Sequence, residues 1–394
     1  MKPKHTTLSI TLIPLLLALF SACNADASAG LFRQISESRA PIGIVYKQLL
    51  AYDTGATTLY YRTDEGIYKT DLTTRTKMQA SVKGAIIQAS YYAGSDMVQY
   101  ITNDSSTVKN TTDANIVTPT DTSVIATNDA LKIKNLYANG LVMLQGEDIS
   151  DASKIRYSLV SLTNSATSAP KTAFPYLDGY SLASVLQMSG HDADDVSTTT
   201  PPILISFVNL SSDFKYYYYD ASSPATDGSA LLELTGLTDK RIAAFWKTGT
   251  KLFALSSDGD LYAGTAGSAA MTRIFDGSKE YDTHAFFYGV VDGTTTHLIS
   301  KTNTKAEDLF VYSVDASTNN VTTASIDEGY AEYLANADIV SALSIGPAGG
   351  ADYVLVATND NGLFKIEINH AFANINSIAN GSSTKSEEYN FDLF

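Results

Sequence analysis

The sequence has almost no cysteine or tryptophan and little proline. Its 394 residues include one cysteine, Cys23, one tryptophan, Trp246, and 10 prolines. A single cysteine excludes a disulfide within the chain, so the stability of the fold has to come from packing. Leu, Glu and Lys rarely recur at helical spacing, which excludes a helix-rich fold. The 24 tyrosines and 15 phenylalanines instead supply aromatic mass for an all-β core.

Basic charge is also scarce. The chain has 27 Lys and Arg against 42 Asp and Glu, a formal net charge of −15. This balance excludes nucleic acid as a partner, because nucleic-acid binding needs basic patches. It also disfavours direct docking onto anionic lipid headgroups. A basic protein partner or cations would suit the acidic surface, although solubility alone also accounts for it.

The first 22 residues have the pattern of a secretory signal peptide. Lys2 and Lys4 make the start basic, residues 8–20 are almost wholly apolar, and two small residues follow. The apolar stretch is short for a bilayer span, which needs about 20 residues. We therefore expect residues 1–22 to be removed on export.

The end of this segment, Phe20-Ser21-Ala22-Cys23, resembles the lipobox of bacterial lipoproteins, in which small residues precede an obligatory cysteine. The family prefers Leu where this chain has Phe20. The resemblance implies cleavage after Ala22, diacylglycerol on the sulfur of Cys23 and acylation of the new N-terminus. Stable anchoring requires more than one acyl chain. The alternative is an ordinary cleaved signal peptide followed by an incidental cysteine.

The residues after Cys23 bear on location and domain organisation. Asn24 is not the Asp that resembles an inner-membrane retention signal in enteric bacteria, which favours the outer membrane, facing the periplasm or the cell surface. Residues 24–40 are small and polar and lack strand periodicity, so we expect residues 23–40 to form a lipidated tether. Residues 41–394 then form the folded domain.

A hairpin signature recurs along this domain. Residues 63–68, 257–262 and 359–364 align without gaps, and each follows an apolar run and contains Asp or Asn with Gly, as tight hairpin turns require. Weaker copies lie between them. The first apolar residues after the seven turns are Ile67, Val108, Ile155, Phe214, Leu261, Leu309 and Leu363, spaced 41 to 59 residues apart.

Each unit contains more than one hairpin. The fifth unit has predicted strands at 241–247, 251–256, 261–264 and 271–275, and the sixth at 284–291, 296–300, 309–314 and 321–325. Four antiparallel strands in about 45 residues form one propeller blade. We predict an all-β fold, a β-propeller of about seven four-stranded blades, with six or eight left open. A pair of β-sandwiches is the competing fold, but it gives no reason for the recurring signature.

The chain resembles repeat propellers in general. It lacks both a Trp-Asp dipeptide in each unit and the Gly-Gly pairs of kelch repeats. In size and anchoring it is similar to the lipid-anchored propeller of the outer-membrane assembly machinery, whose repeat resembles that of quinoprotein dehydrogenases. That repeat has a tryptophan in most blades, which is missing here, so the similarity concerns architecture alone.

Candidate metal ligands are thinly spread. The histidines are His5, His191, His284, His297 and His370, and no pair has metal-ligand spacing. His284 and His297 fall in predicted strands of one unit. The segment from His191 to Asp195 contains three carboxylates that would suit Ca²⁺, but the loop pattern of a calcium site is absent, and a solvated insertion is the alternative. We predict no metal site and no cofactor.

Catalytic motifs are missing as well. The chain has no nucleophile elbow, P-loop or GxGxxG string, so no catalytic residue is predicted and the protein is not expected to be an enzyme. Tyr216, Tyr217, Tyr218 and Tyr219 are consecutive. In a strand, two of these side chains would face each neighbouring blade, which predicts packing. A tyrosine patch at a partner interface is the alternative.

The repeat itself suggests one binding surface. If the hairpin turns share one face of the ring, an acidic rim forms there from Asp64, Glu65, Asp258, Asp260 and Asp360. A basic partner would dock on such a rim, although turns use Asp and Asn in any case.

Together these patterns predict a lipid-anchored propeller of the cell envelope that binds or scaffolds a protein partner. Two alternatives are left open by the sequence. One is a surface adhesin that binds host ligands, and the other is a glycan lyase or hydrolase with its site in the central channel.

Overall fold

The computed structural model of the chain describes residues 45–53, 56–71, 74–78, 85–93, 97–102, 107–111, 116–128, 130–162, 168–187, 202–220, 230–277, 284–292, 295–302, 309–326, 339–345, 352–358, 363–368 and 386–389. All of these belong to one compact unit, Ile44–Phe394. The predicted signal peptide, Cys23 and the predicted tether therefore lie outside the described residues.

Within these ranges the chain forms seven four-stranded antiparallel sheets, each built from four consecutive strands. Blade 1 contains β1 (Tyr46–Asp53), β2 (Thr58–Thr63), β3 (Gly66–Thr70) and β4 (Arg75–Lys77), and blade 2 contains β5 (Ile86–Tyr92), β6 (Met97–Thr102), β7 (Val108–Asn110) and β8 (Ile116–Val117). Blade 3 contains β9 (Lys132–Leu136), β10 (Leu141–Asp148), β11 (Asp151–Leu162) and β12 (Ser168–Ala173), with a short 3-10 turn, η2 (Ala138–Gly140), before β10.

Blade 4 contains β13 (Tyr180–Gln187), β14 (Ile203–Asn209), β15 (Phe214–Tyr219) and β16 (Leu231–Leu234), and blade 5 contains β17 (Ile242–Thr248), β18 (Lys251–Ser256), β19 (Leu261–Thr265) and β20 (Thr272–Phe275). Blade 6 contains β21 (His284–Asp292), β22 (Thr295–Thr302), β23 (Leu309–Asp315) and β24 (Val321–Ile326), and blade 7 contains β25 (Ile339–Ile345), β26 (Asp352–Thr358), β27 (Leu363–Ile368) and β28 (Ser386–Tyr389).

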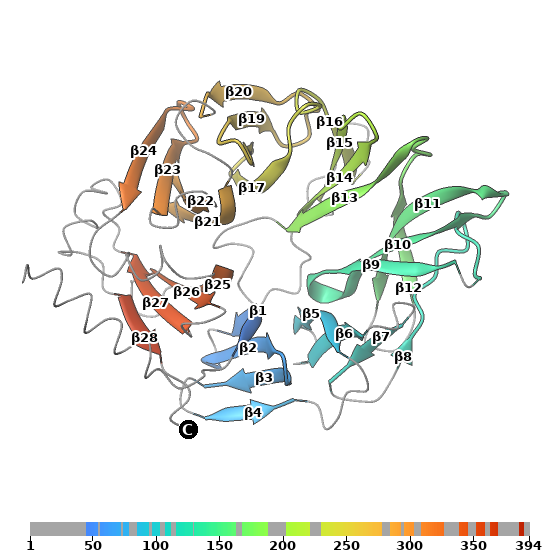
Figure 1. The fold of residues 1–394 in the computed structure, drawn as a ribbon, viewed down its shortest axis with the longest axis horizontal. Helices are drawn as coiled ribbons and strands as arrows, with labels where there is room; N and C mark the ends of the chain where they lie inside the picture. The colour runs from blue at the N-terminus through green and yellow to red at the C-terminus, as the bar shows by residue number, and fades with distance from the viewer. Residues whose placement is uncertain are drawn as a thin grey trace, which may run out of the picture. The chain divides into compact units, whose positions relative to one another are not determined.

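The seven blades follow one another in chain order around a ring (Figure 1). The first strand of each blade lies nearest the centre, and the fourth lies at the outside. The prediction of an all-β propeller with seven four-stranded blades is confirmed, and a pair of β-sandwiches is wrong. The strands predicted for the fifth and sixth units agree with blades 5 and 6 to within two residues at either end.

The hydrophobic core lies between the blades rather than inside one layer. On β14, Ile203, Ile205 and Phe207 pack in the cluster shared with blade 3, whereas Leu204 packs in the cluster shared with blade 5. Successive side chains of a strand point to opposite faces, so a strand buried on both faces is apolar at nearly every position. Blade 4 is therefore stabilised by both of its neighbours.

The ring closes between blade 7 and blade 1. Each of these two blades is made from its own consecutive strands, so no strand is shared across the closure. Instead Leu49 of β1 and Leu343 of β25 belong to one buried cluster. The Leu49 backbone N–H also donates to Ser341 Oγ at 3.1 Å. Side-chain packing and hydrogen bonds of this kind hold the two ends of the ring together.

Candidate functional site

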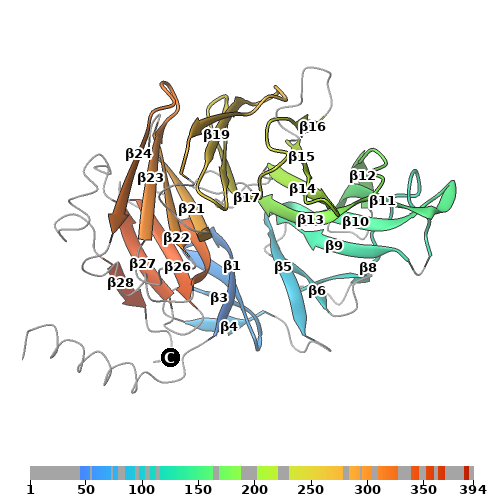
Figure 2. The same cartoon turned by 45° about the horizontal axis from the view of Figure 1, so that its top comes forward.

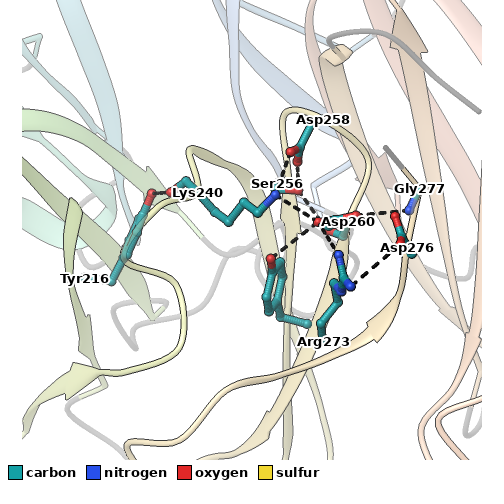
Figure 3. A network of polar contacts seen from close by, with 9 residues as sticks. Tyr216, Lys240, Ser256, Asp258, Asp260, Arg273, Asp276 and Gly277 are labelled. Carbon is teal, nitrogen blue, oxygen red and sulfur yellow. Dashed lines mark hydrogen bonds and ion pairs between the residues drawn. The ribbon is translucent and has the colours of Figure 1, made fainter. Parts of the chain in front are cut away.

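A network of charged and polar side chains lies at one end of blade 5 (Figure 3). Lys240 comes from the connection that leads into β17, and Asp258 and Asp260 come from the turn between β18 and β19. Arg273 belongs to β20, on the outer side of the same blade. The hairpin turn thus brings two carboxylates between a lysine on one side and an arginine on the other.

Asp260 is fully buried, and four donors surround its carboxylate. Lys240 Nζ lies 3.1 Å from Oδ2, and Arg273 Nη1 lies 3.4 Å from the same oxygen. The backbone N–H of Gly277 donates to Oδ1 at 3.1 Å, and the Tyr262 hydroxyl lies 3.5 Å from Oδ2. A buried charge is tolerated where it is paired and hydrogen-bonded in this way.

The Gly277 donor reaches Asp260 because the backbone passes very close to the turn. A Cβ atom at position 277 would lie 2.2 Å from the Gly259 carbonyl oxygen. Gly259 itself has φ of +91°, a conformation that favours glycine. Gly259 and Gly277 therefore let the two backbone segments come close enough for the Gly277 N–H to reach the Asp260 carboxylate.

Asp258 shares the same lysine. Lys240 Nζ lies 2.9 Å from Asp258 Oδ2, and the Ser256 hydroxyl donates to Oδ1. Burial acts to raise the pKa of Asp258, but the hydrogen bonds from Ser256 and Lys240 outweigh it and hold the pKa below its ordinary value. The hydrogen bond to Asp258 raises the pKa of Lys240. Both groups are therefore charged at neutral pH.

Blade 4 is tied to the same network through Tyr216. Its hydroxyl donates to the Lys240 carbonyl oxygen at 2.5 Å and accepts from the Ile242 backbone N–H at 3.0 Å. Burial raises the pKa of Tyr216, so the hydroxyl stays protonated and able to donate. This tyrosine holds the connection between the two blades at its end, where β17 begins.

A second buried carboxylate joins the same two blades at their other end. Asp220 follows β15 and lies 3.1 Å from Lys247 Nζ of β17. It also accepts from the Tyr218 hydroxyl at 2.9 Å. Burial raises the pKa of Tyr218. Both polar clusters therefore clamp blade 4 to blade 5, one at each face of the ring.

The acidic-rim prediction is wrong for Asp260, because its carboxylate is buried and ion-paired rather than displayed. The other described members are partly neutralised. Asp64, whose side chain is 61% exposed, lies 3.5 Å from Lys47, and the exposed Glu65 lies 3.7 Å from Arg75. Asp258 is paired with Lys240 as described above. Asp360 lies outside the described residues.

The four consecutive tyrosines are buried, as the packing interpretation predicted. Tyr217 and Tyr219 pack in the cluster with blade 3, and Tyr216 and Tyr218 pack in the cluster with blade 5. Their burial is incompatible with the alternative of a tyrosine patch at a partner interface.

The histidine and metal predictions are only partly covered by the structure. His284 and His297 lie in β21 and β22 as predicted, but His284 pairs with Thr302 and His297 pairs with Val290, so the register separates them along the sheet. The His191–Asp195 segment and His370 lie outside the described residues. Within the described ranges, no group of three or more His, Cys, Asp or Glu side chains is placed to hold a metal ion.

Sequence reasoning missed the cations that complete the two clusters, Lys240, Lys247 and Arg273. One signal was present for Lys240, which lies in the charged run Asp239-Lys240-Arg241 directly before a strand.

Within the part of the chain that the structure describes, no helix is long and apolar enough to span a membrane.

Comparisons with known proteins address the fold. No family model matches the chain, and no curated protein sequence matches it. Many solved structures do match. The crystal structure of an ancestral GH74 enzyme has a TM-score of 0.53 at 13% identity, covering 89% of this chain and 47% of that one. This chain thus spans about half the length of that enzyme.

Two further structures are YCF48 from Cyanidioschyzon merolae and BamB from Moraxella catarrhalis. YCF48 has a TM-score of 0.50 at 10% identity, covering 83% of this chain and 96% of that one. BamB has a TM-score of 0.43 at 15% identity, covering 82% of this chain and 85% of that one. Identities this low show the fold alone. The GH74 and YCF48 comparisons and the seven sheets agree that this chain is a β-propeller.

Proposed function

We propose that the protein is a lipid-anchored β-propeller of the cell envelope that binds or scaffolds a protein partner. The observation that carries the proposal is that the acidic side chains at the ends of blades 4 and 5 are paired with lysines. Asp220, Asp258 and Asp260 are each held by a lysine that joins one blade to the next or closes a turn. These groups stabilise the ring, and binding rather than catalysis suits a surface built this way.

The ring is a rigid support for its turns. Arg62 of blade 1 donates to the Ile86 carbonyl of blade 2 at 2.6 Å. The Tyr157 hydroxyl of blade 3 accepts from Leu182 of blade 4 at 3.3 Å, and the hydroxyls of Thr248 and Thr296 join blades 5 and 6 at 2.6 Å. Turns held on a rigid scaffold are where proteins commonly place binding surfaces.

The location rests on the lipobox-like segment that ends at Cys23. Acyl chains on this cysteine would hold the propeller at a membrane without a spanning helix. Asn24 favours the outer membrane. Protease added to intact cells distinguishes the two orientations, because a surface adhesin is degraded and a periplasm-facing scaffold is protected.

The test of the proposal measures both membrane anchoring of the protein and its crosslinking to a protein partner. Wild-type protein and a Cys23→Ser variant are expressed in the native cells, and membranes are extracted with Triton X-114. We expect wild type in the detergent phase and the variant outside it. Chemical crosslinking in intact cells, followed by mass spectrometry, should then give a partner with wild type. Wild type that partitions into the aqueous phase, or that captures no protein, contradicts the proposal.

A further inference from the structure

Large exposed apolar side chains gather on two neighbouring blades. Among the described residues the exposed large hydrophobic side chains are Ile87, Ile149, Ile155, Tyr176 and Leu210. All except Ile87 belong to blade 3, to blade 4 or to the connection between them. We call these four residues the blade 3–4 patch. Single exposed apolar residues are ordinary, whereas a group on one face indicates an interaction surface.

Topology puts the patch at one face of the ring. Ile149 is in the turn between β10 and β11, Leu210 is in the turn between β14 and β15, and Tyr176 is in the connection from β12 to β13. In a blade of four antiparallel strands, the turn between the second and third strands and the connection to the next blade lie at the same end. The β10–β11 hairpin reaches outward beyond the neighbouring sheets (Figure 2).

Ile155 lies on β11 just before the residues of that strand that are buried in the core. On β11, Tyr157 and Leu159 pack in the cluster between blades 3 and 4. Ile155 precedes them by two and four positions, so it lies on the same side of the strand, where 42% of it is exposed. Ile155 is therefore the exposed end of the apolar interface between blades 3 and 4.

The turn that carries Leu210 is ordered by its own hydrogen bonds. The Asn209 side-chain carbonyl accepts from the backbone N–H groups of Ser211 and Asp213, each at 2.9 Å. The Asn209 amide donates to Asp213 at 2.9 Å and lies 3.5 Å from the Tyr180 hydroxyl. Leu210 is fully exposed at the tip of this turn. A preorganised apolar side chain loses little conformational entropy on binding.

The charges around the patch favour one kind of occupant. Three cations near it are paired with acids: Lys154 with Asp151 at 3.0 Å, Arg156 with Asp148 at 3.4 Å, and Lys215 with Glu233 at 3.9 Å. Two further acids accept hydrogen bonds from neutral groups, Asp178 from the Tyr176 hydroxyl and Asp213 from Asn209. These groups comprise five acids and three cations, and this negative balance repels an anionic membrane and attracts a basic protein surface.

We propose that the blade 3–4 patch docks a protein partner that presents an apolar side chain flanked by lysine or arginine. The inference rests on the proposed binding function and specifies its surface and the chemistry of its partner. Leu210 and Ile149 supply the apolar contact at two turn tips, and Asp178 and Asp213 face the partner's cations.

The test uses a photo-crosslinking amino acid, p-benzoylphenylalanine, in the full lipidated chain in intact cells. It replaces Leu210 in one variant and Thr250 in the control. Thr250 is exposed and lies in the turn between β17 and β18, at the opposite face of the ring. We expect a protein adduct at position 210 and none at position 250, with Lys or Arg beside the crosslinked apolar residue of the partner.

Purified components then test the energetics. With the identified partner, the double variant Ile149→Ser Leu210→Ser should raise Kd at least tenfold and Asp178→Lys severalfold, whereas Thr250→Ser should leave Kd unchanged. Lipid adducts, equal adducts at both positions or no adduct at position 210 overturn the proposal, as does an unchanged Kd in the double variant. If whole-chain crosslinking still captures a partner, the proposed function stands and only this surface is wrong.

Discussion

The carboxylate of Asp260 is fully buried and interacts with Lys240, Arg273 and the Gly277 N–H. Removing the charge while keeping the shape leaves two cations without their shared partner. Lys240 keeps Asp258 and Arg273 keeps Asp276, so the loss is that of charge-assisted hydrogen bonds to one buried acceptor, about 2 kcal/mol. We therefore expect Asp260→Asn to lower the free energy of unfolding by about that amount and to shift the urea midpoint downward.

Asp64→Asn is the matched control for that substitution. Asp64 lies in the corresponding turn of blade 1, but its side chain is 61% exposed and its distance to Lys47 is 3.5 Å. Exposed ion pairs contribute little because water and salt screen them. Its urea midpoint should stay at the wild-type value, and equal losses in the two variants would contradict the role assigned to Asp260.

Asp258 makes the stability of this cluster depend on pH. Its pKa in the folded protein is held below the ordinary value of 3.8. A lowered carboxyl pKa contributes stability that is present above the unfolded pKa and is lost as pH falls through the folded one. The urea midpoint should therefore drop below about pH 4, and the drop should be shallower in Asp258→Asn. Parallel pH profiles for the two proteins would be inconsistent with this account.

At the scale of the element, β15 shows how one strand joins two blades. Tyr216 accepts from the buried Ile242 N–H at 3.0 Å and donates to the Lys240 carbonyl at 2.5 Å. Tyr216→Phe leaves both backbone groups without this partner, which costs about 1 to 3 kcal/mol. Urea unfolding measures the loss.

The neighbouring residue supplies the comparison. Tyr217 faces blade 3, and its hydroxyl donates at 3.2 Å to Glu233, whose side chain is 49% exposed. Water replaces this bond readily, so Tyr217→Phe should cost clearly less than Tyr216→Phe. A larger loss for Tyr217→Phe would show that the hydroxyl of Tyr216 does not join the blades.

The elements themselves were largely predictable from the sequence. Hairpin turns rich in Asp and Gly are local signals, so the strands of blades 5 and 6 could be placed to within two residues. The direction of the four tyrosines followed from the period of two along a strand. Burial of Asp260 could not be foreseen, because Lys240 and Arg273 reach it through the twist and register of a whole blade.

At the scale of the whole molecule, the closure of the ring depends on packing between blades 7 and 1. Leu343 of β25 is buried in the cluster that it shares with β1. Truncating a buried leucine to alanine costs about 3 kcal/mol. We expect Leu343→Ala to lower the urea midpoint by a corresponding amount. A midpoint equal to that of wild type would show that this junction does not hold the ring.

We propose that a lipid anchor at Cys23 sets where the whole ring works. The lipobox-like segment predicts that the mature chain begins at Cys23 and carries both a diacylglyceryl thioether and an amide-linked acyl chain. Intact-mass spectrometry of protein extracted from native membranes tests this claim directly. The account predicts a mass that lacks residues 1–22 and includes these lipids. An unmodified Cys23, or an N-terminus at any other residue, would contradict it.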